Sequence, residues 1–284
     1  MTDSMMIVTT LDELFYARRF LDAPVGLVPT MGFLHAGHIS LVRQARSECK
    51  SVVATIFVNP TQFAQNEDLA KYPRDVERDL KMLDAEEVDI VWIPTDEVMY
   101  PSGYQTWVEV ETLTKPLEGS IRPGHFRGVT TIVSKLFNAT QPDKAYFGQK
   151  DAQQAAVIRQ LARDLSYPIE VVVCPTLRET DGLALSSRNS YLDKFQRQAA
   201  VVLYKALSAA KTAFTNGETN AKTICQIVRD VVKTEPLARL QYVSCADYQM
   251  LVELETINVN ALLSLAVFVG NTRLIDNFIL GDFE

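Results

Sequence analysis

The sequence predicts an α/β fold, with a Rossmann-like parallel sheet covered by helices on both faces and a smaller C-terminal α+β domain. The first 175 residues alternate short β-rich runs with stretches of helical period. Repeated strand–helix–strand units form right-handed crossovers and a parallel sheet. The run 52–58 is apolar at every position except Thr55, as expected for a strand with both faces covered. After Pro175, helical stretches are followed by clustered strands, which indicates a second domain.

Hydrophobic patterns predict the elements of the first domain in order. Strands are expected at 25–28, 52–58, 88–93, 144–147 and 169–174, with an alternating edge strand at 107–111. Helices are expected at 10–21, 37–49, 74–86, 129–139 and 151–165. The first helix opens with Thr10 and Glu13, which have the spacing of a capping box.

The second domain is predicted to contain two helices followed by three strands. The helices are expected at 192–214 and 221–233, and the strands at 241–246, 263–270 and 273–280. The last two strands flank Asn271 and predict an antiparallel hairpin. We therefore expect two domains, one at 1–176 and one at 177–284.

Composition excludes several classes of protein. With 47% apolar and 22% charged residues, the 284-residue chain is typical of a soluble globular protein. Its net charge of -7 argues against a nucleic-acid partner, because such binders usually present a basic face. No apolar run approaches the roughly 20 residues that span a membrane. The acidic N-terminal segment lacks the pattern of a secretory signal.

The cysteines predict a cytoplasmic protein. Cys49, Cys174, Cys225 and Cys245 are widely spaced and form no C-x-x-C pair. Such residues are typical of reduced thiols rather than of a disulfide framework or a metal site.

The segment 29–38 is the first of four that follow predicted strands or the domain boundary. It places His35 and His38, two of only three histidines, where a strand turns into a helix. Gly37 allows a ligand to approach the backbone, and a helix N-terminus attracts phosphate. Two imidazoles there can stabilise charge that develops at the α-phosphorus of a nucleotide. Metal ligation and chance surface histidines are the alternatives.

Two further segments follow predicted strands. Asn59 and Gln62 offer neutral hydrogen-bonding groups for hydroxyls and a carboxylate, although a plain proline turn also explains them. Gly148 and Lys150 suit phosphate contact at a strand-to-helix junction, whereas Asp151 has the alternative role of a helix cap. The spacing does not match a Walker A loop, and no G-x-G-x-x-G motif is present.

The fourth segment, 185–189, supplies hydroxyl groups and the Arg188 guanidinium, which can fork onto phosphate; a capped surface turn is the alternative. Weaker candidates are the segment 122–128, where His125 either binds an anion or is packed, and the segment 71–74. Asp75 and Asp79 could approach magnesium, but a solvated helix face is the favoured interpretation for both.

These segments resemble the pantothenate synthetase (pantoate–β-alanine ligase) family, within the H-x-G-H nucleotidylyltransferase superfamily. The resemblance covers 29–38, 57–63, 72–74, 122–129, 146–154 and 181–189. It implies ATP, pantoate and β-alanine as substrates, magnesium, and a homodimer. On this resemblance, we expect the domain at 1–176 to bind the nucleotide and pantoate, and the domain at 177–284 to act as a lid. It implies His38, His35, Lys150 and Arg188 in catalysis, and Gln62, Gln154 and Asn59 in substrate binding. The implied ATP contacts are Met31, Gly32, Phe33, Leu34, His35, Ala36, Gly37, His38, Gly148, Gln149, Lys150, Asp151, Leu177, Leu185, Ser186, Ser187 and Arg188.

The predicted activity is an AMP-forming ligase of pantothenate biosynthesis, which forms pantoyl-adenylate and transfers the acyl group to β-alanine. Ala36, Phe33 and Leu185 depart from residues common in the family, but none removes a group with a proposed chemical role. A nucleotidylyltransferase, a tRNA synthetase and a non-catalytic ATP sensor are the alternatives.

Overall fold

The computed structural model describes residues 5–63 and 69–281, which form two compact units. The first unit comprises Met1–Gly148 and Val157–Cys174, and the second comprises Gln149–Ala156 and Pro175–Glu284. The predicted fold class is confirmed, because a six-stranded parallel sheet with helices is accompanied by a small antiparallel sheet. The functional division at residue 176 into a binding domain and a lid stays a prediction.

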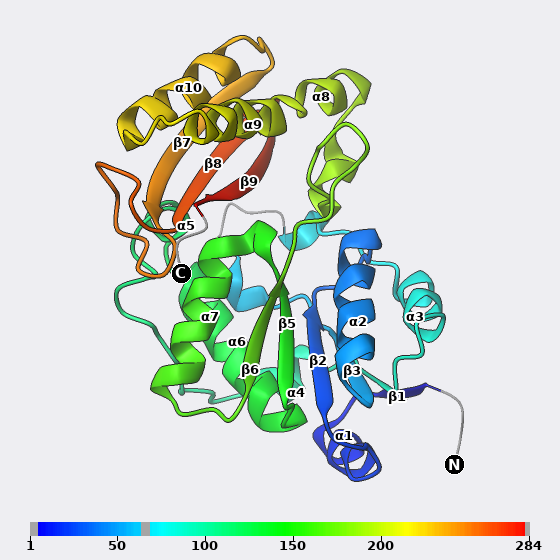
Figure 1. Ribbon diagram of the computed structural model, residues 1–284. Helices are drawn as coiled ribbons and strands as arrows, with labels where there is room; N and C mark the ends of the chain where they lie inside the picture. Colours follow the sequence, from blue (N-terminus) through cyan, green and yellow to red (C-terminus); the bar gives the residue numbers. More distant parts are fainter. Residues whose placement is uncertain (1–4, 64–68, 282–284) are drawn as a thin grey trace. The chain divides into compact units, whose positions relative to one another are not determined.

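The first unit is built on one parallel sheet with the strand order β1-β4-β3-β2-β5-β6 (Figure 1). Its strands are β1 (Met6–Val8), β2 (Val25–Thr30), β3 (Ser51–Ile56), β4 (Ile90–Trp92), β5 (Lys144–Gly148) and β6 (Glu170–Cys174). All six residues of β3 are buried, as its largely apolar sequence predicts. The strand order reverses between β2 and β5, and ligands of open α/β sheets bind beyond the carboxyl ends at such a switch point.

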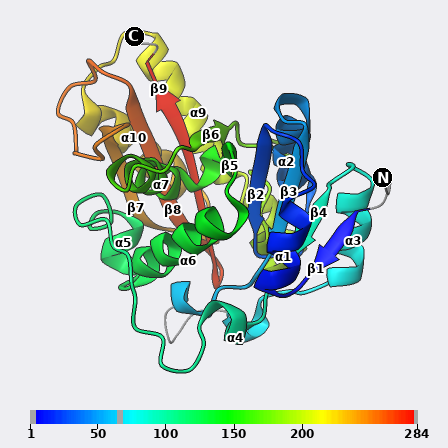
Figure 2. The same cartoon turned by 90° about the horizontal axis from the view of Figure 1, so that it is seen from below.

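Helices cover both faces of this sheet. Figure 2 shows α1 (Leu11–Arg18) and α6 (His125–Thr140) on one side of the strands and α2 (Ala36–Glu48) on the other. The capping box of α1 is confirmed, since Thr10 and Glu13 cap each other's backbone. The other α-helices in the part of residues 5–174 that the structure describes are α3 (Val76–Asp84), α4 (Asp96–Met99), α5 (Glu118–Ile121) and α7 (Ala152–Asp164).

The edge strand predicted at 107–111 is wrong. Val108 N–H donates to Thr131 Oγ1 at 3.1 Å, and Val108 O accepts from Thr130 Oγ1 at 2.6 Å. Hydroxyl groups of α6 thus satisfy this backbone in place of a neighbouring strand. The sheet instead gains β1, whose three residues are too few to display an alternating pattern.

The second unit contains an antiparallel sheet of β7 (Ala238–Asp247), β8 (Ala261–Val269) and β9 (Thr272–Leu280). The predicted hairpin between β8 and β9 is confirmed. Helices α9 (Val202–Thr215) and α10 (Ala221–Lys233) share its apolar core. The single helix predicted at 192–214 is wrong, because α8 (Lys194–Ala199) ends before α9 begins. Leu203 N–H bonds to Ala200 O at 3.3 Å, which marks a tighter turn between the two helices.

None of the helices in the described ranges is long and apolar enough to cross a membrane. The four cysteines are buried and form no disulfide in the structure. Burial raises the pKa values of Cys174 and Cys225 to about 11. Thiols with raised pKa values are poor nucleophiles at neutral pH.

A carboxylate at the end of α2 makes the stability of the first unit depend on pH. Glu48 accepts hydrogen bonds from Lys144 Nζ at 2.8 Å and from Tyr146 OH at 3.0 Å. The Lys144 bond is the main cause that lowers the pKa of Glu48 from 4.5 to about 2. A lowered folded-state pKa stabilises the protein above the unfolded value, and this contribution disappears as pH falls towards the folded value.

We expect Glu48→Gln to lower Tm at pH 7, with the difference from wild type shrinking as pH falls from about 4.5 towards about 2. Thermal unfolding followed by circular dichroism across this range measures the effect. Glu170→Gln is the control, because Glu170 also lies near Lys144, at 3.2 Å, but its side chain is 63% exposed. A Tm difference for Glu48→Gln that stays constant with pH contradicts the expectation.

Candidate functional site

Two histidines cap the N-terminus of α2 reciprocally. His35 Nδ1 accepts from Gly37 N–H at 3.1 Å, and His38 Nδ1 accepts from His35 N–H at 3.3 Å. The ring centroids lie 4.0 Å apart. Because both Nδ1 atoms accept, each neutral ring carries its hydrogen on Nε2. The turn after β2 therefore holds two imidazole N–H donors near a helix N-terminus, which is the chemistry predicted for phosphate contact.

Helix α3 supports the backbone of this turn. Gly32 and Phe33 have left-handed φ angles of 79° and 50°. Phe33 N–H and Leu34 N–H each donate to a different oxygen of Asp79 at 2.7 Å. Arg78 Nη2 donates to Leu34 O at 2.7 Å. The Asp79 carboxylate thus holds two backbone N–H groups of the turn, and the Arg78 guanidinium holds one of its carbonyl groups.

The interpretation of Asp79 as part of a solvated helix face is wrong, because its exposed fraction is 0%. Burial raises the pKa of Asp79, and the hydrogen bonds from Leu34 and Phe33 oppose this rise. A signal for this role is present in the sequence, since Asp79 lies four residues before the buried Leu83 and so shares its helix face. A carboxylate on an apolar face requires buried partners.

Asn59 and Gln62 form a second polar group in the first unit. Asn59 is 1% exposed, and its Oδ1 accepts from Tyr100 OH at 2.8 Å. Its Nδ2 donates to Gly128 O at 3.2 Å and to Gln62 Oε1 at 3.1 Å. Gln62 Nε2 lies 3.0 Å from Met31 Sδ, so this group adjoins the histidine turn. Asn59 is thus placed to orient Gln62.

The segment 122–128 packs against Gln62, which agrees with the interpretation of His125 as a packed side chain. His125 is 8% exposed, and its Nδ1 lies 2.8 Å from Gln62 O. Arg122 Nη1 lies 3.1 Å from His125 Nε2. A Cβ atom added to Gly128 would lie 2.4 Å from Thr61 O, so α6 meets this segment backbone to backbone. Glycine at 128 permits that approach.

A cavity of about 340 Å³ lies at the carboxyl ends of β2, β3 and β4. This volume is in the lower range for small-molecule sites. Its wall includes three predicted ATP contacts, Met31, Gly32 and Phe33, together with charged groups of α3, of the segment before α3 and of the first residue of α4. The charged lining residues are Arg74, Asp75, Asp79 and Asp96.

The predicted ATP contacts Gln149, Lys150 and Asp151 form a 3-10 turn directly after β5. The ammonium of Lys150 lies 3.5 Å from the Asp151 carboxylate. Gln154 is the third residue of α7. The side chain of Lys150 is 19% exposed, so the turn holds this cation partly sheltered from water.

The predicted loop 185–188 is ordered by local hydrogen bonds. Leu185 N–H donates to Leu177 O at 3.0 Å, which joins two of the predicted ATP contacts. Ser186 caps the 3-10 helix Ser187–Tyr191 and accepts from Arg188 N–H at 3.3 Å. The capped turn, which was the alternative interpretation of this segment, is therefore present. The phosphate-binding role of Arg188 stays a prediction.

Residues distant in sequence support these segments and escaped prediction. Arg178 forms a bidentate ion pair with Asp276, and Asn277 binds the backbone of Gln149 and Lys150. The partners are separated by 98, 128 and 127 positions, respectively. No local motif indicates such pairs.

The switch point of the parallel sheet and the histidine-bearing helix N-terminus together define a Rossmann-like α/β protein of the nucleotide-binding type. The family model described as Pantoate-beta-alanine ligase matches residues 6–279. This chain therefore belongs to the pantoate–β-alanine ligase family, which confirms the predicted resemblance.

Curated relatives match along nearly the full chain. The pantothenate synthetase of Herpetosiphon aurantiacus is 59% identical over 277 residues, covering 97% of this chain and 100% of that protein. The pantothenate synthetase of Roseiflexus sp. (strain RS-1) is 56% identical over 276 residues, covering 97% and 99%.

Solved structures of the family have the same fold. The pantothenate synthetase of Thermus thermophilus has a TM-score of 0.93 at 45% identity, covering 96% of this chain and 99% of that chain. The pantoate–β-alanine ligase of Francisella tularensis, described as complexed with β-γ ATP and β-alanine, has a TM-score of 0.81 at 35% identity. That match covers 97% of this chain and 98% of the other.

Proposed function

We propose that this protein condenses pantoate with β-alanine to form pantothenate, consuming ATP and releasing AMP and pyrophosphate. The observation that best supports this proposal is the His35–His38 turn, whose two Nε2–H groups suit the oxygens of a phosphate undergoing substitution. The family match over residues 6–279 supports the choice of acid and amine.

In the proposed first step, a carboxylate oxygen of pantoate attacks the α-phosphorus of ATP. A P–O bond forms, the bond to pyrophosphate breaks, and pantoyl-adenylate results. His35, His38, Lys150 and Arg188 offset the negative charge of this step. The carboxylate is already a nucleophile, so the protein contributes positioning and charge stabilisation.

In the proposed second step, the amine of β-alanine attacks the carbonyl carbon of the mixed anhydride. A C–N bond forms, the C–O bond to AMP breaks, and the amine loses a proton. Pantoyl-adenylate hydrolyses in water, so a site that excludes water favours the amide product. A lid role for residues 177–284 belongs to this proposal.

We assign the binding roles by the predicted motifs. Gln62 and Gln154 bind pantoate, and Asn59 acts through its hydrogen bond to Gln62. The proposed ATP contacts are residues 31–38, 148–151, Leu177 and 185–188. The contact between Gln62 and Met31 supports adjacent acid and nucleotide sites in the first unit.

Magnesium is proposed to enter as the Mg–ATP substrate complex. No group of three or more His, Cys, Asp or Glu side chains across residues 5–63 and 69–281 is arranged to hold a metal ion. Both Asp79 oxygens already accept backbone N–H groups. Magnesium commonly binds through substrate phosphates, water and one or two carboxylates, which fits this donor set.

A homodimer and a cytoplasmic location are also proposed. The family resemblance supports the dimer. The four buried cysteines, none of which forms a disulfide in the structure, suit a reducing compartment.

The test is release of AMP and pyrophosphate from Mg–ATP, with pantoate and β-alanine supplied together and then omitted singly. AMP that forms only with both substrates, with pantothenate detected by mass spectrometry, supports the proposal. Pyrophosphate formed with a phosphorylated substrate, leaving a stable nucleotidylated product, would indicate a nucleotidylyltransferase. ATP binding without turnover would indicate a sensor.

A further inference from the structure

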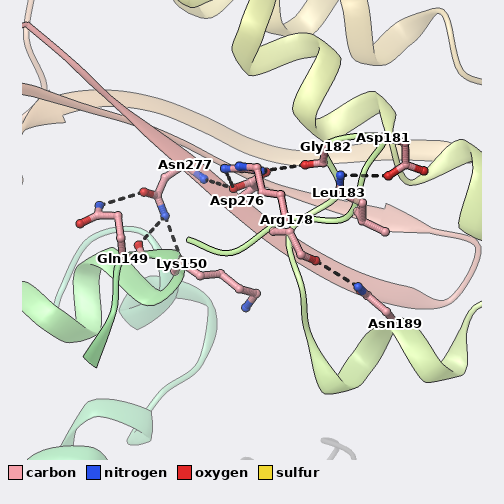
Figure 3. Close-up of polar contacts among 10 residues, drawn as sticks. Gln149, Lys150, Arg178, Asp181, Gly182, Leu183, Asn189, Asp276 and Asn277 are labelled. Atoms are coloured by element: carbon pink, nitrogen blue, oxygen red, sulfur yellow. Dashed lines mark hydrogen bonds and ion pairs between the residues drawn. The ribbon is translucent and has the colours of Figure 1, made fainter. Parts of the chain in front are cut away.

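One side-chain amide in β9 holds the backbone of the turn that contains Lys150. Asn277 is 4% exposed, and its Nδ2 donates to Gln149 O at 3.0 Å and to Lys150 O at 2.9 Å. Its Oδ1 accepts from Gln149 Nε2 at 2.9 Å. Figure 3 shows these contacts converging on Asn277 from the turn. The amide therefore fixes two consecutive carbonyl groups and one side chain.

The preceding residue holds a second segment. Asp276 is 2% exposed and accepts from Arg178 Nη1 and Nη2 at 2.6 Å and 2.8 Å. Arg178 Nη1 also donates to Gly182 O at 3.0 Å (Figure 3). A bidentate pair fixes direction as well as distance. Arg178 thereby constrains the stretch between Leu177 and Leu185, which leads into the predicted loop 185–188.

The two contacts are coupled within the strand. The backbone N–H of Asn277 donates to Asp276 Oδ1 at 2.8 Å, so the Asp276 carboxylate is bonded to the backbone of the residue that carries the side-chain amide. Adjacent residues of a strand direct their side chains to opposite faces, so one short length of β9 can hold two segments at a fixed separation. Both residues are buried, which makes each hydrogen bond costly to lose.

We infer that Asp276 and Asn277 are positioning residues. They hold Lys150 and the loop 185–188 at the relative positions needed to contact the phosphates of one nucleotide. This inference rests on the proposed function of those segments. Asn277 acts through Lys150, and Asp276 acts through Arg178. Neither residue needs to touch the substrate.

The positioning role predicts a selective loss in the first half-reaction. Asn277→Ala leaves Gln149 O and Lys150 O without their donor, so the turn relaxes and the ammonium loses its fixed position. We expect pantoate-dependent ATP–pyrophosphate exchange to fall about 10- to 100-fold, since a displacement of about 1 Å can cost that much. KM for pantoate and for β-alanine should stay within about twofold, because positioning of the phosphates affects mainly the rate of adenylation.

Asn277→Asp, which keeps the size but removes both N–H donors, should lose exchange to a similar extent. Val228→Ala is the stability control, because Val228 is 0% exposed in the core of the same unit and its cluster contains neither Lys150 nor any residue of the loop 185–188. Tm is measured for every variant. An Asn277→Ala protein with wild-type exchange overturns the inference, as does Val228→Ala if it loses as much exchange for the same fall in Tm.

A double-mutant cycle separates positioning from general damage. If Asn277 acts through Lys150, exchange by Lys150→Ala with Asn277→Ala should equal that of Lys150→Ala alone. Independent losses that multiply overturn the inference. If wild type shows no pantoate-dependent exchange, the proposed function itself fails. If wild type exchanges and Lys150→Ala is impaired while Asn277→Ala is not, only the positioning role fails.

Discussion

Replacing His38 by alanine is expected to lower kcat about 10²- to 10³-fold while the protein remains folded. The substitution removes one Nε2–H donor from the proposed site of charge development, and a single such donor contributes on this scale. It also removes the acceptor for His35 N–H, which is 3.3 Å from His38 Nδ1. Loss of such a cap costs about 1 kcal/mol, which a folded domain tolerates.

His38→Asn distinguishes catalysis from capping. Asparagine can accept the His35 N–H, but its amide is too short to replace the reach of Nε2. Single-turnover formation of AMP, compared with Tm, measures both effects. Near-native Tm with a low rate for His38→Asn assigns the loss to the missing donor. A folded His38→Ala protein with nearly normal kcat contradicts the catalytic role.

Asp79→Ala is expected to reduce both activity and stability strongly. The carboxylate accepts the N–H groups of Phe33 and Leu34, which are 2.7 Å away and follow Gly32 in a left-handed turn. An unsatisfied buried N–H costs about 1–3 kcal/mol, and two lose their acceptor here. The turn leads into His35, so kcat should fall by at least about tenfold, in line with the cost of small displacements. Denaturant unfolding and steady-state kinetics measure the two losses.

Asp79→Asn separates the charge from the geometry. Asparagine keeps one acceptor oxygen but directs its NH₂ at the other backbone N–H, so activity should still fall. Burial raises the pKa of Asp79 above 3.8. Because this pKa is higher in the folded state than in the unfolded state, the free energy of unfolding of wild type falls as pH rises from 3.8 to the folded-state pKa. Asparagine does not ionise, so the variant does not lose stability in this way. The stability of the variant relative to wild type should therefore increase with pH over that range. Wild-type kcat in Asp79→Asn contradicts the supporting role.

Local sequence patterns predict the fold class because strands and helices of an α/β protein differ in hydrophobic period. The buried run at 52–58 and the helix at 221–233 are such cases, and both elements are confirmed. The edge strand at 107–111 is wrong because hydroxyl groups of α6, more than twenty positions away, satisfy its backbone. The break between α8 and α9 has no proline or glycine to announce it.

Local sequence patterns also indicate only some of the residues of the candidate site. Motifs at strand ends single out His35, His38, Asn59 and Gln62, and the structure places the two pairs each in direct contact. Their catalytic and binding roles stay predictions. Asp79 shares a helix face with the buried Leu83, which indicates burial, but the turn that its carboxylate supports lies 45 and 46 positions away, so no local pattern indicates those partners. The role of Asn277 is even harder to predict from the sequence, because its partners Gln149 and Lys150 lie 128 and 127 positions away.

Gly128 and Gly148 differ in the space that the protein leaves for a side chain. At Gly128 the obstacle is the chain itself, because a Cβ atom would lie 2.4 Å from Thr61 O. At Gly148 nothing within the described residues lies within 4 Å of an added Cβ, and its φ is not left-handed. Saturation libraries scored by growth without pantothenate thus report two separate quantities. Variants at residue 128 measure how much the packing of the chain tolerates, whereas variants at residue 148 test whether the proposed nucleotide occupies the space beside Gly148.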